Sequence, residues 1–469
     1  MDDYVGANLL FATLTDRDLD GTTIPGLASG WETRSASDYL LTIRRDATCA
    51  DGTKITPTAV ANSLNYYADK TTTPPHPSAS QVFGTGKPTI TADDAAGTVT
   101  VTLAQPNSDF PAALSIPQAG IICPAGLADK AALAAGSAKG AFSGPYTLGR
   151  VKPAVEYTYD LRPDYIAWPR YSAPLAGVPS AKLVFGISTD PSTTANKLLS
   201  GDLDLGAVTG DTLDRFAGRG DYHQAKITSA NVYIAFNEAP GHYFAGKPEA
   251  RKAVAQAIDR TVFNKVFSNN ASPVFNSVVP KTYACALDDP SLVPVQDPSA
   301  AAAALKGAII RFPASLSFGD KGKGAEYIQK ALDDAGATVN LKKIDNATWA
   351  TTIQQPEADW DMTLMGDVNA ASLTSISLSK VIGPGYQSGG INLTASDNPE
   401  GLAALAAGRA ATDPQQRCAH YQAAQKSVLD RQDVVPLAGV ALSLVTAPDV
   451  TVATPGHSIR NYFTLRVTK

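Results

Sequence analysis

The chain has 469 residues, of which 44% are hydrophobic and 18% charged, and its net charge is -5. This length is about three times a typical domain of ~150 residues, so we expect two or three lobes. Nucleic-acid binding requires clustered positive charge, and this mildly acidic chain has no basic run, so we expect no nucleic-acid partner.

The first third of the chain is predicted to be rich in β-strands. Alternating apolar and polar residues predict strands at 39–44 and 98–103. Between them, Thr56 and Pro57 predict the start of a helix, because threonine caps a helix and proline fits its first position. The charge-free segment 110–128 contains three prolines, and we expect a loop or a buried strand there.

The middle of the chain is predicted to begin with short β-rich units. We expect a hairpin at 146–161, a strand at 183–187, a helix at 191–199 and a strand at 204–208. Gly201 follows the helix, where a left-handed residue commonly ends it.

Strands and helices alternate from about residue 231 onward. Strands are predicted at 232–236, 308–312, 339–344, 361–365, 434–445 and 462–467. Helices are predicted at 249–267, 325–335, 348–354, 401–408 and 415–429, and the alanine run 300–304 is a first helical turn capped by Ser299. Such alternation is typical of an α/β protein with a mainly parallel sheet covered by helices.

Signatures of catalysis are missing from the sequence. No serine-hydrolase, zinc-protease or phosphate-loop motif occurs, and no two of the five histidines have helical metal-ligand spacing. We therefore expect a binding protein without catalytic residues, metal or cofactor.

Four cysteines occur in the chain, at positions 49, 123, 285 and 418. No pair has the C-x-x-C spacing of zinc and redox motifs. The residues alone leave two alternatives open, which are four buried thiols or two disulfides in an exported protein.

Short motifs follow one another in a recognisable order along the chain. They are Asp20-Gly21, Pro25-Gly26-Leu27-Ala28, Gly30-Trp31, Ala50-Asp51-Gly52-Thr53, Ser143-Gly144-Pro145-Tyr146, Arg162-Pro163-Asp164-Tyr165, the LLSGDLDL stretch at 198–205, Phe236-Asn237 and the block 249–260. This series resembles the family 5 extracellular solute-binding proteins, the peptide- and nickel-type receptors of ABC importers.

The resemblance implies a two-lobed clamshell of the periplasmic-binding-protein type II, with an extra subdomain in lobe one. Mapped onto this chain, lobe one is 1–228 plus 445–469, its insert is about 33–180, and lobe two is 229–444. Ligand closes such lobes because it binds the closed state better than the open one. The implied partners are a small-molecule or peptide ligand and the permease subunits of an ABC transporter.

The resemblance also implies a location and an oligomeric state. We expect an extracytoplasmic monomer, which in the full-length protein carries a signal peptide and is anchored to the membrane as a lipoprotein.

Ligand contacts are expected where strands end, because ligands of open α/β sheets lie beyond their carboxyl ends. The expected ligand-binding residues are Phe11, Thr13, Phe312, Ser315, Lys323, Asp367, Asn369 and Tyr386. In peptide-binding relatives an aspartate in the loop after "MGW" pairs with the peptide amine, and that position is Ala370 here. The amine anchor is therefore either displaced to Asp367 or absent.

Two ligand classes remain open from the sequence. One is a peptide or peptide-like small molecule, and the other is an uncharged ligand such as a sugar or an aromatic natural product. An enzyme on an unrelated two-lobed fold is the remote alternative.

The implied lobes also select a disulfide pairing. We expect Cys49–Cys123 and Cys285–Cys418, since every other pairing would join the two lobes and block their motion. Disulfides of this kind persist in the oxidising compartment of an exported receptor.

Overall fold

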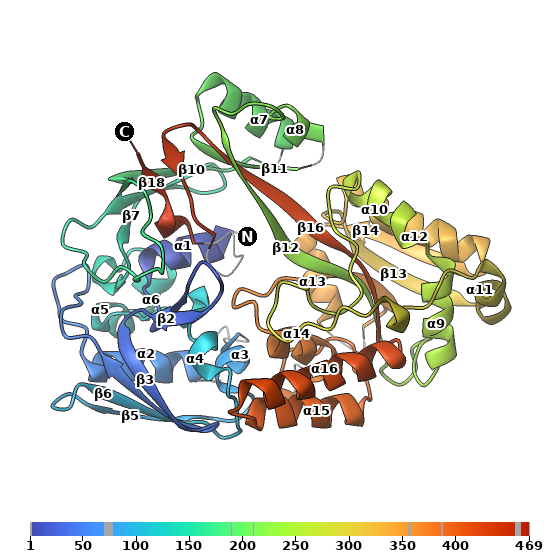
Figure 1. Cartoon of the computed structure of the whole chain (residues 1–469), viewed down its shortest axis with the longest axis horizontal. Coiled ribbons are helices and arrows are strands. Elements are labelled where there is room, and N and C mark those ends of the chain that lie inside the picture. Colours follow the sequence, from blue (N-terminus) through green and yellow to red (C-terminus); the bar gives the residue numbers. More distant parts are fainter. Residues whose placement is uncertain are drawn as a thin grey trace.

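The computed structural model describes residues 2–69, 78–188, 190–209, 211–354, 358–385, 388–454 and 461–468. It has two halves, one formed by the elements α1 to β10 with the C-terminal β17 and β18, and the other by α9 to α16 (Figure 1). Two long strands, β12 (His223–Phe236) and β16 (Val434–Thr446), run side by side from one half to the other (Figure 1).

The first half is built from short strands and helices. Its elements are α1 (Asp2–Leu10), β1 (Thr15–Arg17), β2 (Thr23–Pro25), β3 (Ala28–Ser35), β4 (Asp38–Ile43), α2 (Pro57–Ala68), α3 (Ala79–Phe83), β5 (Thr89–Asp93), β6 (Thr98–Thr102), α4 (Phe110–Ala113), η1 (Pro117–Ala119), α5 (Pro124–Ala128), α6 (Lys130–Ala134), η2 (Lys139–Ala141), β7 (Tyr146–Lys152), β8 (Glu156–Leu161), β9 (Val178–Pro179), β10 (Lys182–Gly186), β17 (Val450–Thr451), η7 (Tyr462–Thr464) and β18 (Arg466–Val467). Strands β3, β4, β6 and β5 form an antiparallel sheet in that order.

The second half carries the longer helices. Its elements are α9 (Pro248–Ala257), α10 (Arg260–Ser268), η3 (Pro290–Leu292), α11 (Pro298–Leu305), β13 (Ile309–Ser315), η4 (Asp320–Gly322), α12 (Lys323–Asp334), β14 (Thr338–Ile344), α13 (Asn346–Ile353), β15 (Met362–Asp367), α14 (Thr374–Ile382), α15 (Pro399–Ala410) and α16 (Pro414–Asp430). A third group, α7 (Pro191–Ser200), β11 (Leu205–Val208) and α8 (Asp211–Asp214), lies at the far end of β12 and β16 (Figure 1).

The central sheet corrects the predicted strand direction. Its order is β11-β16-β12-β15, and every pair in it is antiparallel. Among the described residues only β13 and β14 pair in parallel over several residues. Alternation of strands and helices indicates parallel pairing only when neighbouring strands follow one another in the chain, whereas β12 pairs with strands more than a hundred residues away.

The β12–β16 pairing is irregular at two closely spaced places near its middle. The register runs regularly up to Thr228, shifts before Asn231, and shifts again between Val232 and Tyr233. Strand β15 pairs with β12 only from Asn231 onward. The interruption therefore lies where β12 begins to pair with a strand on each of its two edges.

Helix ends are set by local caps, several of which the sequence predicted. Thr56 caps α2 by accepting a hydrogen bond from the Ala59 N–H at 3.2 Å. Gly201 ends α7 with φ 80°, as predicted. The predicted single helix at 249–267 is wrong, because the carboxylate of Asp259 accepts from the N–H groups of Thr261 and Val262 and starts a second helix.

Two further predictions about helix starts need correction. The segment 110–128 forms short helices, because its prolines occupy the first positions of α4, η1 and α5, where a missing N–H costs nothing. The cap of α11 is Asp297, whose carboxylate accepts from Ser299 and Ala300 N–H, and not Ser299.

Each half has its own large apolar cluster. The cluster of the second half surrounds Trp360 and Phe236, and that of the first half surrounds Tyr39 and Phe110. Both predicted disulfides are present, with Cα–Cα distances of 6.1 Å for Cys49–Cys123 and 4.6 Å for Cys285–Cys418, so the predicted pairing is confirmed.

Asp109 connects the two halves directly. Its carboxylate accepts hydrogen bonds from the hydroxyl groups of Ser375 on α14 at 2.5 Å and Tyr421 on α16 at 2.8 Å. Arg417 of α16 approaches the same carboxylate at 3.7 Å. The halves are thus held together by contacts between segments more than 260 residues apart.

Candidate functional site

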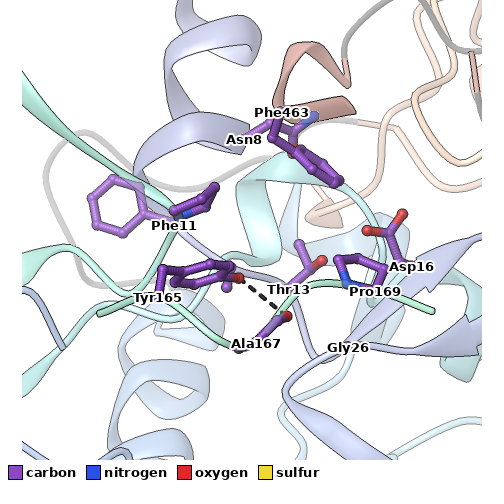
Figure 2. A pocket seen from close by; sticks show the side chains of 11 residues that line it. Asn8, Phe11, Thr13, Asp16, Gly26, Tyr165, Ala167, Pro169 and Phe463 are labelled. Atoms are coloured by element: carbon purple, nitrogen blue, oxygen red, sulfur yellow. Dashed lines mark hydrogen bonds between the residues drawn. The ribbon is translucent and has the colours of Figure 1, made fainter. Parts of the chain in front are cut away.

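A pocket in the first half contains two of the residues predicted to bind ligand, Phe11 and Thr13 (Figure 2). Its lining residues are Asn8, Phe11, Ala12, Thr13, Asp16, Gly26, Pro145, Tyr165, Ala167, Pro169 and Phe463. They come from α1 and the segment after it, from strand β1, from the 165–169 segment and from η7. Segments from both ends of the chain therefore meet around one hollow.

The pocket is narrow. It contains about 320 Å³ of empty space, part of it open to solvent, but only about 20 Å³ admits the centre of a water molecule. That is room for roughly one water. In this conformation the pocket accommodates a small group rather than an aromatic ring.

Asp16 is the acidic residue of the pocket lining. On β1, Thr15 points away from the pocket and its hydroxyl donates to the Pro111 carbonyl at 2.6 Å. Successive side chains of a strand point to opposite faces, which directs Asp16 towards the pocket (Figure 2). The side chain is 6% exposed, and the N–H of Arg17 donates to its Oδ1 at 2.7 Å. Burial raises the pKa of Asp16 to about 7.

Aromatic side chains surround this carboxylate. The Tyr165 hydroxyl donates to the carbonyl of Ala167 at 3.2 Å (Figure 2). Its ring meets that of Trp168 edge to face. The buried hydroxyl of Tyr171 has no hydrogen-bond partner among the described residues. Burial raises the pKa of Tyr171, and the negative charge of Asp16 adds to that rise. These rings lower the local polarity around Asp16, which strengthens any hydrogen bond that it accepts.

We expect Asp16 to make the folded protein less stable as the pH rises from 5 to 8. Its pKa is higher in the folded protein than the ~3.9 of an unfolded aspartate, so the folded state binds the proton more tightly. This contribution to stability is complete below pH ~4 and is lost as the pH rises through about 7. Over pH 5 to 8 the loss is about 2 kcal/mol.

Thermal unfolding of the wild type and Asp16→Asn at both pH values measures this effect. The substitution removes the carboxyl and should flatten the pH dependence by that amount. Equal slopes in the two proteins would contradict the buried-carboxyl interpretation.

Asp367, the acidic anchor predicted from the sequence, is the last residue of β15. The side chain is 2% exposed, and its two oxygens accept hydrogen bonds from the Lys380 ammonium and the Ser377 hydroxyl. Lys380 also donates to the carbonyl of Val368 at 2.8 Å. Asp367 is therefore neutralised by a lysine of the same protein.

Asn369 supports the loop in which it lies. Its amide donates to the Leu373 carbonyl at 2.7 Å and to the Ser377 hydroxyl at 2.9 Å, and it accepts from the Leu373 N–H at 3.4 Å. The carbonyl of Asn369 accepts from the Tyr283 hydroxyl at 3.5 Å. Local bonds of this kind occupy the side chain that was expected to contact ligand.

The remaining predicted residues lie apart from the pocket. Phe312 is fully buried in the apolar cluster of the second half, so the structure places it in the core. Ser315 is also fully buried, with its hydroxyl 2.7 Å from that of Ser317. Lys323 is exposed at the first turn of α12. Tyr386 lies outside the described residues.

The loop after β15 nevertheless reaches the first half. Ala371 and Leu373 belong to the same apolar cluster as Leu14, and Ala12 and Ala370 pack against that cluster. The segment before β1 and the loop after β15 thus both border the junction of the two halves.

Sequence reasoning did not identify Asp16, Tyr165 or Phe463 as site residues. Asp16 stands in the polar run Thr15-Asp16-Arg17-Asp18, which is typical of a solvated turn. It is buried by the 165–171 segment, about 150 residues away in the sequence. No local pattern in the sequence signals that burial.

Two further properties bear on the class of protein. Within the described ranges, no group of three or more histidine, cysteine or acidic side chains could hold a metal ion. None of the helices in the same ranges has the length and apolar composition needed to cross a membrane.

Comparisons with known proteins agree on one family. The family model described as "Bacterial extracellular solute-binding proteins, family 5 Middle" matches residues 22–380. A curated "Probable di/tripeptide-binding protein 5" of Pseudomonas aeruginosa (strain UCBPP-PA14) is 26% identical over 321 residues, which cover 66% of this chain and 58% of that protein. The chain thus spans 58% of the length of that relative.

Solved structures match over the full chain. A substrate-binding protein from Microbacterium hydrocarbonoxydans, complexed with 4-hydroxybenzoate hydrazide, has 37% identity and a TM-score of 0.88, covering 100% of this chain and 95% of that one. AgaA from A. tumefaciens R10, in complex with agropinic acid, has 22% identity and a TM-score of 0.83, covering 99% and 94%. The predicted α/β fold of this group of binding proteins is confirmed. The chain belongs to the bacterial extracellular solute-binding proteins of family 5.

Proposed function

We propose that this protein is the extracytoplasmic solute receptor of an ABC importer. It captures a small ligand between two lobes and presents the closed form to the permease subunits, without converting the ligand chemically. The observation that carries the proposal is the family match at residues 22–380 on a fold whose two halves are joined by β12 and β16. The two disulfides are consistent with an oxidising, extracytoplasmic location.

We propose the lobe boundaries and the anchoring that the family resemblance implies. Lobe one comprises 1–228 with 445–469 and contains the insert 33–180, and lobe two comprises 229–444. The register shift of β12 after Thr228 supports a boundary at that point. The protein acts as a monomer, and its full-length form is held at the membrane as a lipoprotein.

For the ligand we propose a peptide-like acyl compound. A relative of 37% identity was crystallised with 4-hydroxybenzoate hydrazide, and the curated relative is described as binding di- and tripeptides. An acyl hydrazide and a peptide share a carbonyl bonded to N–H, and both can end in a nitrogen that donates hydrogen bonds. The aromatic rings of Phe11, Tyr165 and Phe463 suit a ligand with an apolar portion.

A thermal-shift panel of acyl hydrazides, dipeptides and sugars tests this function. A ligand at 100 times its dissociation constant should stabilise the protein by about 2.7 kcal/mol and raise its melting temperature accordingly. Small-angle scattering should show a smaller radius of gyration with the bound ligand, and mass spectrometry should recover that ligand unchanged. Turnover of the ligand would contradict the receptor function, and a shift produced by sugars alone would contradict the proposed peptide-like ligand.

A further inference from the structure

The buried carboxylates of Asp16 and Asp367 differ in what already binds them. Both oxygens of Asp367 accept hydrogen bonds from side chains of helix α14, which are the hydroxyl of Ser377 and the ammonium of Lys380. A ligand amine that bound Asp367 would have to displace that lysine from a site only 2% exposed. The carboxylate that the sequence singled out is thus already compensated.

Asp16 has no comparable compensation. In the described residues, its carboxylate accepts from the Arg17 N–H at 2.7 Å and forms no salt bridge within 4 Å. The Arg17 guanidinium donates to the Thr23 hydroxyl at 3.1 Å, and its charge acts on Asp16 without a direct hydrogen bond. The nearby Tyr171 hydroxyl also has no partner there. A carboxylate that is 6% exposed and has one neutral donor retains most of its capacity to accept hydrogen bonds.

The dimensions of the pocket decide what can reach this carboxylate. The space that admits the centre of a water is about 20 Å³, which is enough for one group of the size of water. A terminal –NH2 or –NH3+ is of that size, and an aromatic ring is not. Hydrogen bonds from such donors to an ionised carboxylate are about twice as strong as those between neutral groups.

We propose that Asp16, and not Asp367, anchors the N–H donor end of the ligand. The terminal nitrogen enters the narrow end of the pocket and donates to Asp16, while the acyl portion extends along Phe11 and Tyr165. This inference rests on the proposed solute-binding function and adds the residue that recognises the ligand. The donor is the terminal –NH2 of an acyl hydrazide or the α-ammonium of a short peptide, which share this hydrogen-bonding chemistry.

Matched ligand pairs test the role of Asp16 by calorimetric titration at pH 7.5. One pair is 4-hydroxybenzoate hydrazide with methyl 4-hydroxybenzoate, and the other is Met-Leu with N-acetyl-Met-Leu. In each pair the second compound keeps the apolar portion and lacks the terminal –NH2 or –NH3+ group. We expect the wild type to bind at least one donor compound at least tenfold more tightly than its partner. The pair that shows this difference in affinity tells whether the donor is the –NH2 of an acyl hydrazide or the α-ammonium of a peptide.

Variants of the two carboxylates separate the alternatives. Asp16→Ala should weaken binding of the donor compound at least tenfold and leave the compound without the donor within threefold. Asp16→Asn preserves the shape of the side chain and should have the same effect, so it replaces the alanine variant if that one does not fold. Asp367→Asn should leave the preference intact, and so should Asp20→Asn, the control at an exposed aspartate four residues along the chain.

Three results would overturn the inference. The first is an unchanged preference in Asp16→Asn, and the second is loss of the preference in Asp367→Asn alone. The third is a wild type that binds none of the donor compounds or binds both members of each pair equally. In all three cases, a solute that raises the melting temperature in the thermal-shift panel would still support the proposed receptor function. Failure of the receptor function would instead appear as no change in melting temperature with any solute.

Discussion

Replacing Arg251 with methionine is expected to lower the free energy of unfolding by about 3–5 kcal/mol. The Arg251 side chain is 1% exposed and lies between two buried carboxylates, at 2.8 Å from Glu238 and 3.3 Å from Asp433. It also donates to the backbone carbonyls of Phe244, Arg431 and Gln432. Methionine fills a similar volume but leaves the two carboxylates without this cation.

The loss of unfolding free energy in Arg251→Met should be smaller at low pH than at high pH. Burial already raises the pKa of Glu238 to about 7, and removal of the arginine charge raises it further. Protonation at pH 5 then removes part of the uncompensated charge, so urea unfolding should show a smaller deficit at pH 5 than at pH 8. Arg431→Met is the control, since Arg431 is 39% exposed at 3.3 Å from Asp433 and a pair of this kind contributes about 0–1 kcal/mol. Equal losses in the two variants would refute the role of burial.

Removal of either disulfide is expected to produce a second large loss of stability. The Cys49–Cys123 bridge joins cysteines that are 74 residues apart in the chain, and the Cys285–Cys418 bridge joins cysteines that are 133 residues apart. Closing loops of that length stabilises a protein by about 4–5 kcal/mol in the chain-entropy model. Double alanine variants at Cys49 with Cys123, and at Cys285 with Cys418, measure the two contributions by urea unfolding.

The two losses should differ because the backbones differ. Cys285 has φ 64°, a left-handed conformation that costs a non-glycine residue about 1 kcal/mol or more. Without its disulfide this residue can relax, which offsets part of the loss at that site. We therefore expect the Cys49–Cys123 variant to lose as much stability as the other variant or more, although its loop is shorter. A wild type whose unfolding midpoint is unchanged by reductant would contradict both expectations.

The sequence predicted the features of the fold that depend on neighbouring residues. Thr56 with Pro57 marks a helix start, and Gly201 marks a helix end, because capping involves atoms within three or four residues. The cap at Asp259 has the same local origin and was missed because an apolar stripe continues across it. The antiparallel central sheet could not be predicted in this way, since strand direction there is decided by contacts across hundreds of residues.

The site shows the same division between local and long-range information. Phe11 and Thr13 were predicted as the segment that lobe one contributes near its first strand, and both line the pocket. Asp367 was predicted from the family resemblance, but its ion pair with Lys380 depends on a helix that returns over the loop. Asp16 was missed because its burial comes from a segment that the sequence places about 150 residues away.

The interrupted pairing of β12 with β16 has a consequence for the energy needed to deform the molecule. Between Thr228 and Asn231 the cross-strand ladder is not continuous, and β15 joins only beyond that point. A bulge lets a strand bend and twist locally, so rotation at this place changes a few backbone dihedrals without breaking regular ladder bonds. Closing the proposed lobes would then cost little elastic energy. The measured affinity of a solute would accordingly reflect its own contacts more than the work of deforming the sheet.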